Sequence, residues 1–172
     1  MTSVWATHRS NDLGQGDFLP DCWVPLVGPG FATQDVEEDV AVESRDLIIV
    51  TQSCDLANEK NHLAALCPIY TVDCWEENNE NFKKKGIWEN VRRGRHEGLH
   101  LLASPEEPRN NRQALVVDFR QIFSLPVAYL KRHADQVSHR WRLQSPYLEH
   151  FSQAFARFFM RVGLPVDLPP FK

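Results

Sequence analysis

The clearest strand pattern in the sequence is Asp46-Leu47-Ile48-Ile49-Val50-Thr51-Gln52. Its apolar centre is rich in β-branched residues and predicts a strand that is buried on both faces of a sheet. A second apolar run, Leu63–Tyr70, follows after the polar segment Asn58–Asn61. Because the connection between the two runs is short, they are expected to form an antiparallel pair.

Further strands are expected on both sides of this pair, which predicts an α+β fold. The alternating segment Cys22–Val27 contains Pro25, a residue that strands tolerate at a sheet edge or a bulge. The other expected strands are Leu99–Ala103, Ala114–Phe119 and His139–Leu143, and a short helix is expected over Val127–Ala134.

A helix near the C-terminus is specified in more detail and is expected over residues 146–162. Ser145 is suited to the N-cap, Pro146 to the first helical position, and Gly163 to the left-handed position after the helix. An apolar stripe at helical spacing predicts a face that packs on the sheet, with a partner-binding face as the alternative. The stripe consists of Leu148, Phe151, Phe155, Phe158, Phe159 and Val162.

Length and composition indicate one domain over residues 1–172, with 42% hydrophobic residues available for a core. The net charge of -4 at pH 7 confines any nucleic-acid site to a local patch. No apolar run approaches the roughly 20 residues needed to cross a bilayer, and the N-terminus lacks the pattern of a signal peptide. We therefore expect a cytoplasmic protein with no membrane contact, in which residues 1–15 form a flexible arm.

The four cysteines do not predict a disulfide framework, because a cytosolic protein keeps its thiols reduced. Cys22 and Cys67 lie in apolar runs and are expected to be buried as small hydrophobic residues. No pair of cysteines has the CxxC spacing of a zinc site, so no metal or other cofactor is expected. The alternative is a mixed site in which cysteines converge with His62, His96 or His100.

The first candidate site is the polar segment Ser53, Cys54 and Asp55, which follows the first buried strand. Side chains at the end of a strand are held in place and exposed by the following loop. A thiol reacts as the thiolate, so Cys54 would need a base or a positive charge nearby. His62 is the nearest histidine in sequence. The alternative is a structural turn in which Asp55 caps the backbone.

The second candidate pairs Arg45, which precedes the first buried strand, with Thr71, which follows the second. In an antiparallel pair the start of one strand lies beside the end of the other, so the two residues are expected on one rim. An arginine can bind a phosphate through two parallel hydrogen bonds, and in RNA cleavage it stabilises the charge of the transition state. The alternative is that Arg45 is an ordinary surface residue.

The third candidate is a basic stretch within residues 73–98, a polar segment that is expected to be an insertion or long loop. Clustered cations attract phosphates, and aromatic rings between them can stack on unpaired bases. A solvated loop without a ligand is the alternative. The candidate RNA-binding residues are Lys83, Lys84, Lys85, Trp88, Arg92, Arg93 and Arg95.

Three segments in the first half of the chain resemble the MazF/PemK-like ribonuclease toxins. Gly16-Asp17-Phe18 resembles their opening strand, Arg45–Val50 their arginine followed by a buried strand, and Leu66–Thr71 a later strand. The resemblance covers about residues 16–71. It implies a small antiparallel SH3-like β-barrel that dimerises and cleaves RNA without a metal. Arg45 and Thr71 would then be the catalytic residues.

The sequence departs from that family at several places. Asp46 stands where the toxins have proline, and the 73–98 segment and the C-terminal helix are additions. The Ser53-Cys54-Asp55 segment is not part of the toxin pattern.

The leading hypothesis is a protein of a bacterial stress or defence system that binds and cleaves single-stranded RNA. The first alternative is a non-catalytic adaptor that uses the same barrel to bind a protein, such as an antitoxin or an effector-complex subunit. The second alternative is thiol chemistry at Cys54.

Overall fold

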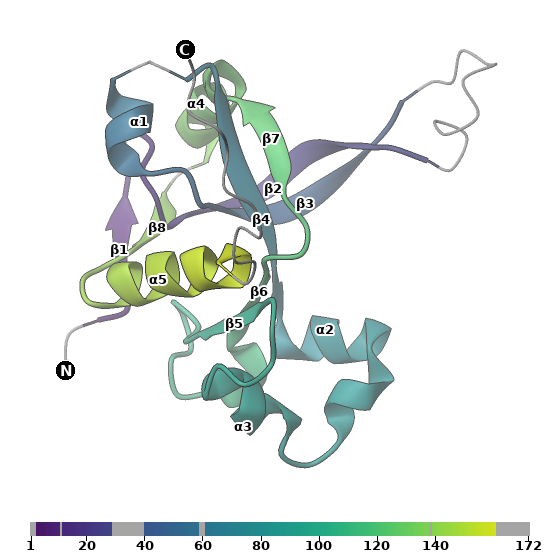
Figure 1. Ribbon diagram of the computed structural model, residues 1–172. Helices are drawn as coiled ribbons and strands as arrows, with labels where there is room; N and C mark the ends of the chain where they lie inside the picture. The colour runs from purple at the N-terminus through teal and green to yellow at the C-terminus, as the bar shows by residue number, and fades with distance from the viewer. Residues whose placement is uncertain (1–2, 11, 29–39, 59–60, 138, 161–172) are drawn as a thin grey trace, which may run out of the picture.

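The computed structural model describes residues 3–10, 12–28, 40–58, 61–137 and 139–160. Within these ranges the protein is α+β, with an open antiparallel sheet of eight strands (Figure 1). The strands are β1 (Trp5–His8), β2 (Asp17–Leu26), β3 (Ala41–Ile49), β4 (Leu63–Thr71), β5 (Leu99–Leu102), β6 (Leu115–Asp118), β7 (Phe123–Pro126) and β8 (Arg140–Leu143). The α-helices are α1 (Ser53–Ala57), α2 (Val72–Asn78), α3 (Ile87–Arg92), α4 (Val127–Gln136) and α5 (Tyr147–Phe159), and the 3-10 helices include η2 (Glu80–Lys83) and η3 (Asn111–Gln113).

The centre of the sheet is the antiparallel pair β3–β4, which confirms the pairing predicted from the two apolar runs. Leu47 lies opposite Pro68, and Ile49 lies opposite Leu66. The whole strand order is β1-β8-β2-β3-β4-β6-β5, and β7 also pairs with β4. Strand β4 is therefore bonded to β3 along one edge and to β6 and β7 along the other.

Successive residues of β3 pack on opposite faces of the sheet. Leu47 and Ile49 belong to a core cluster that includes Leu130 of α4, whereas Ile48 belongs to a cluster that includes Phe151 of α5. The sheet thus lies between two helical layers, with α5 crossing one face (Figure 1). Full burial of a side chain of this size contributes about 1.5–3 kcal/mol, so this double burial is the main source of stability.

Helix α5 carries the predicted apolar stripe, and the stripe covers the sheet. Phe151 is fully buried, and Leu148, Phe155 and Phe158 pack against the same cluster. Phe159 is 54% exposed, because it lies at the last turn of the helix beyond the sheet contact. The prediction that the stripe packs on the sheet is confirmed for Leu148, Phe151, Phe155 and Phe158, and is wrong for Phe159.

The start of this helix differs from the prediction. The N-cap position is Pro146 rather than Ser145, and no side chain caps the helix. The amide of Tyr147 instead donates to the carbonyl of Gln144 at 2.8 Å, so a backbone bond takes the place of the expected serine cap. Val162 and Gly163, and with them the predicted C-terminal end, lie outside the described residues.

The flexible arm expected over residues 1–15 is replaced in part by strand β1. Trp5 pairs with Leu143 of β8, is buried, and donates from Nε1 to the carbonyl of Ala103 at 2.7 Å. A tryptophan that finds both an apolar site and a hydrogen-bond partner orders a segment whose composition is otherwise polar.

The segment 73–98 is largely helical rather than a long loop. Helices α2 and α3 surround a third cluster of buried residues, Trp75, Val91, Leu99 and Val116, on which Phe82 and Trp88 also pack. The sequence did not predict this small core, because its aromatic residues are spaced irregularly between lysines, arginines and glutamates and form no helical stripe.

Strands β2 and β3 run on together beyond the sheet as a two-stranded ribbon, which projects from the body in Figure 1. The pairing register shifts between Leu19 and Cys22, where Asp21 has a φ of 52°. Aspartate tolerates this left-handed conformation better than most residues. No helix in the described ranges has the length and apolar character needed to span a membrane.

Candidate functional site

An open groove with a volume of about 480 Å³ lies where β3 leaves the sheet and β4 ends. It is lined by Asp21, Glu43, Ser44, Arg45, Asp46, Ile69, Tyr70, Thr71 and Cys74. The antiparallel pairing of β3 and β4 brings the two predicted catalytic residues, Arg45 and Thr71, into this groove. We call it the Arg45 groove.

Arg45 is held between two polar side chains in the groove. Its Nε forms an ion pair with the carboxylate of Glu43, two residues earlier on the same face of β3. Its Nη1 donates to the hydroxyl of Tyr70 at 2.8 Å. Burial raises the pKa of Tyr70, although Arg45 opposes that effect, so the phenol keeps its proton at neutral pH.

The hydroxyl group that contacts Arg45 therefore belongs to Tyr70 rather than to Thr71. Leu47 is paired with Pro68. Arg45 lies two residues before Leu47 and Tyr70 lies two residues after Pro68, so the antiparallel register, extended by two positions, brings them opposite each other. Thr71 follows Tyr70 at the end of β4 and lines the same groove, but the contact of its hydroxyl is with the start of α2. The Oγ1 of Thr71 accepts from the amide of Cys74 at 3.1 Å and caps helix α2, while its own proton remains available to a ligand.

Three carboxylates accompany the single guanidinium in the lining of the groove. Asp46 Oδ1 accepts from the amide of Asp21 at 3.0 Å, and Asp21 Oδ1 accepts from Ser44 Oγ at 3.2 Å. Burial, followed by the nearby charge of Asp21, raises the pKa of Asp46. The lining therefore combines one cation, paired with Glu43, with carboxylates that can accept a proton.

Sequence reasoning missed Glu43 and Tyr70 as partners of Arg45. Glu43 could have been found from period-two alternation along β3, because residues two apart share a face. Tyr70 required the pairing register, which the sequence does not specify when 13 residues, 50–62, connect the two strands.

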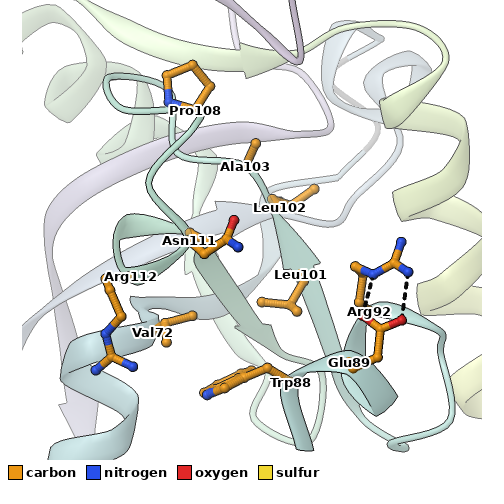
Figure 2. A pocket seen from close by; sticks show the side chains of 11 residues that line it. Val72, Trp88, Glu89, Arg92, Leu101, Leu102, Ala103, Pro108, Asn111 and Arg112 are labelled. Atoms are coloured by element: carbon orange, nitrogen blue, oxygen red, sulfur yellow. Dashed lines mark hydrogen bonds and ion pairs between the residues drawn. The ribbon is translucent and has the colours of Figure 1, made fainter. Parts of the chain in front are cut away.

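The predicted RNA-binding residues lie on the helical segment, and the described lining of the Arg45 groove contains none of them. Arg92 and Arg93 both bind Glu89 through Nε, at 2.7 and 2.6 Å. Lys84 donates to Asn81 Oδ1 at 3.0 Å. The side chains of Lys83, Lys85 and Arg95 are exposed. Trp88 and Arg92 line a second pocket, between α3 and β5, that Figure 2 shows from close by.

The Ser53-Cys54-Asp55 segment forms the short helix α1 at the end of β3. Ser53 Oγ accepts from the amide of Gln15 at 3.0 Å, which ties the helix to the N-terminal loop. The exposed thiol of Cys54 lies 3.7 Å from Gln52 Oε1 and 3.8 Å from Asp55 Oδ1. Neither neighbour supplies the positive charge that stabilises a thiolate.

All four cysteines are free thiols. Cys22 and Cys67 are buried, as predicted, and burial raises the pKa of each thiol to about 12. Among the described residues, no three His, Cys, Asp or Glu side chains converge in a group that could hold a metal ion. The alternative of a mixed cysteine–histidine site therefore finds no counterpart in this part of the chain.

A buried ion cluster holds the N-terminal loop against β8. The carboxylate of Asp17 accepts from Arg140 Nε at 2.9 Å, Arg142 Nη2 at 2.8 Å and the amide of Gly14 at 3.0 Å. The side chains of Asp17 and Arg140 are both fully buried. Asp17 belongs to the segment that resembles the toxin opening, and its contacts here are structural.

A scan against protein-family models finds no match to this chain, and no curated protein matches it.

Proposed function

We propose that this protein binds single-stranded RNA and cleaves it in the Arg45 groove without a metal ion. The observation that carries the proposal is the position of the Arg45 guanidinium between a carboxylate and a phenol in an open groove. Those three groups are what cleavage through the 2′-hydroxyl requires: a base, a phosphate-binding cation and a proton donor.

In the proposed reaction, the carboxylate of Glu43 takes the proton of the 2′-hydroxyl. The 2′-oxygen forms a bond to phosphorus, the bond from phosphorus to the 5′-oxygen breaks, and Tyr70 donates its proton to that oxygen. Arg45 stabilises the charge that develops on the phosphoryl oxygens, and Thr71 adds a hydrogen bond. The products are a 2′,3′-cyclic phosphate and a 5′-hydroxyl end, and the two groups are restored when Glu43 releases its proton to water and Tyr70 takes one up from water.

The basic helical segment would hold the strand beside the groove. Exposed lysines and arginines on α3 and its flanks attract the phosphate backbone, and Trp88 offers a ring for stacking. The residues proposed for this role remain Lys83, Lys84, Lys85, Trp88, Arg92, Arg93 and Arg95.

For the fold, we propose that β2, β3, β4, β6 and β7 correspond to the SH3-like barrel of the MazF/PemK-like toxins. The antiparallel β3–β4 pair and the bent edge formed by β6 and β7 along β4 support this correspondence. It suggests a cytoplasmic, dimeric protein of a bacterial stress or defence system, with an antitoxin-like protein as its partner.

The test is incubation of the purified protein with a pool of unstructured RNA oligonucleotides in the presence of EDTA. Mass spectrometry of the products should show 2′,3′-cyclic phosphate ends for the wild type and none for Arg45→Ala. Arg132→Ala, which removes an exposed arginine from α4, is the matched control and should cleave as the wild type does. Intact RNA after incubation with a folded wild-type protein would rule out the enzyme.

A second candidate function, a non-catalytic adaptor, is favoured by the β2–β3 ribbon. Trp23 is 58% exposed and shares a face with Pro25 and its partner Val42, and Val42 is 60% exposed. Exposed apolar surface of this kind is typical of a protein-binding site. A pull-down that recovers one stoichiometric protein with the wild type, loses it with Trp23→Ser and contains no RNA would support the adaptor.

A further inference from the structure

The second pocket lies between α3, β5 and the loop that leads to η3, and has a volume of about 470 Å³. Its floor is apolar and includes Val72, Leu101 and Leu102. Trp88 lies at one side and Asn111 on the η3 side, while Arg112 lines the edge with its guanidinium turned toward Glu76 and Asp73 of α2 (Figure 2). We call it the Trp88 pocket. Its size lies within the range of small-molecule sites and is suited to a single nucleotide.

The indole ring of Trp88 is fixed in place before any ligand binds. Its Nε1 donates to Glu76 Oε1 at 2.7 Å, and Phe82 packs on it with ring centroids 5.2 Å apart. Glu76 is itself held by Arg112, whose Nη1 and Nη2 donate to its two oxygens at 3.1 and 2.9 Å. The hydrogen bond from Arg112 lowers the pKa of Glu76, so the carboxylate stays ionised and keeps these contacts at neutral pH. A ring held in this way loses little entropy when a ligand stacks on it.

The rim of the pocket carries two guanidiniums, one carboxylate and one amide. Arg92 binds Glu89 through two hydrogen bonds of 2.7 Å each, and Arg93 binds the same carboxylate. Two arginines, Arg92 and Arg93, therefore neutralise the negative charge of Glu89. Arg112 contacts Glu76 and Asp73 through its two terminal nitrogens, and its Nε–H takes part in neither of these contacts.

The pocket lies next to the Arg45 groove along the chain. Thr71 lines the groove, and the following residue, Val72, lines the pocket, because the two side chains leave the start of α2 in different directions. Because these two lining residues are adjacent in the chain, a strand bound in the groove would reach the pocket by passing the start of α2.

We infer that the Trp88 pocket binds one unpaired base of a single-stranded RNA. The base stacks on Trp88, the amide of Asn111 hydrogen-bonds to its edge, and Arg112 binds the flanking phosphate. The inference rests on the proposed RNA-binding function and names the residues that would select a nucleotide there. Asn111 and Arg112 were not among the residues singled out from the sequence.

The first experiment is photo-crosslinking of the full chain to an unstructured RNA decamer that carries 5-iodouridine at one position, with peptide mapping. We expect a cross-link within α3 at Trp88 or within η3. Cross-links confined to other surfaces, such as Trp23 on the β2–β3 ribbon, would overturn the inference. This experiment uses the wild-type protein and so does not depend on whether a variant folds.

The second experiment measures the affinity of a fluorescent decamer for variants with unchanged circular dichroism and melting temperature. Trp88→Leu should weaken binding about tenfold, the scale of one lost base–aromatic stack. Trp88→Phe retains an aromatic ring but removes the N–H that binds Glu76, and should keep most of the affinity. Phe159→Leu, a control at an exposed aromatic side chain of α5, should bind as the wild type does. Equal affinity of Trp88→Leu and the wild type would overturn the inference, as would an equal loss for Trp88→Phe and Trp88→Leu.

The two proposals can fail separately. Binding that depends on Trp88 without any cleavage products would keep the pocket and remove the enzyme. Cleavage that is unchanged in Trp88→Leu, with unchanged affinity, would keep the enzyme and remove the pocket. A wild-type protein that binds no RNA at all would remove both.

Discussion

Arg45 donates a 2.8 Å hydrogen bond to the hydroxyl of Tyr70, and this contact links β3 to β4 at the end of their pairing. The two residues are 25 positions apart in the sequence and meet because the strands are antiparallel. Glu43 completes the arrangement from the other side of the guanidinium. If Glu43, Arg45 and Tyr70 act in catalysis, substitutions that keep the size of their side chains should reduce RNA cleavage. If the three residues only stabilise the fold, such substitutions should leave cleavage unchanged.

Glu43→Gln should abolish most of the RNA cleavage while preserving RNA binding. The amide keeps the size of the side chain but cannot take a proton, and loss of a general base costs about 10²–10⁴-fold in rate. Single-turnover cleavage and equilibrium binding of the same oligonucleotide measure the two effects. Cys54→Ser serves as the control and should cleave normally, since no group that activates the thiol lies beside it. A Glu43→Gln protein with an unchanged rate would contradict its role as the base.

Asp17→Asn should destabilise the fold strongly, because it leaves Arg140 buried without its anionic partner. Breaking a buried ion pair on one side costs about 3–5 kcal/mol of unfolding free energy. Urea denaturation followed by circular dichroism measures the change. The exposed Glu106→Gln makes the same chemical change at the surface and should alter stability by less than about 0.5 kcal/mol. Similar urea midpoints for Asp17→Asn and Glu106→Gln would show that the buried ion cluster contributes little to stability.

Phe151→Ala should reduce the stability of the fold much more than Phe159→Ala, although both residues belong to the apolar stripe of helix α5. Phe151 is fully buried between the helix and the sheet, so its truncation leaves a cavity and should cost about 3–5 kcal/mol. Phe159 is 54% exposed, and its truncation should cost far less. Thermal melting of both variants tests the expectation. Equal losses would mean that the stripe does not carry the packing of α5.

Stability should fall as the pH is lowered from about 6.5 to about 4, because His100 is buried. Burial lowers the pKa of His100 to about 4, and His150 on α5 adds to this effect. Between those pH values the unfolded chain takes up a proton at His100 that the folded chain does not. The free energy of unfolding therefore decreases with acidification, by about 3 kcal/mol at most. Urea midpoints from pH 4.5 to 7.5 should show a flatter dependence for His100→Leu than for the wild type. His62→Gln, at an exposed histidine, should retain the wild-type slope.

Much of the framework could be predicted from the order of residues. The β-branched run at Leu47–Val50 specifies a strand buried on both faces, and the stripe on α5 specifies a helix that covers the sheet, since each pattern is complete within one element. The meeting of Arg45 and Thr71 at one groove followed from the antiparallel sense of two neighbouring strands. These features depend on local periodicity and on a short connection.

The contacts between residues far apart in the sequence depend on tertiary packing and could not be predicted from local patterns. Trp5 is ordered by a carbonyl 98 residues away, Asp17 is bound by Arg140 123 residues away, and Trp88 is fixed by Glu76 and Arg112. Tertiary packing also made Tyr70 rather than Thr71 the contact of Arg45, while the Thr71 hydroxyl caps helix α2. Periodicity within a segment records which face of that segment is buried. Which distant side chain it meets depends on how all the segments pack at once.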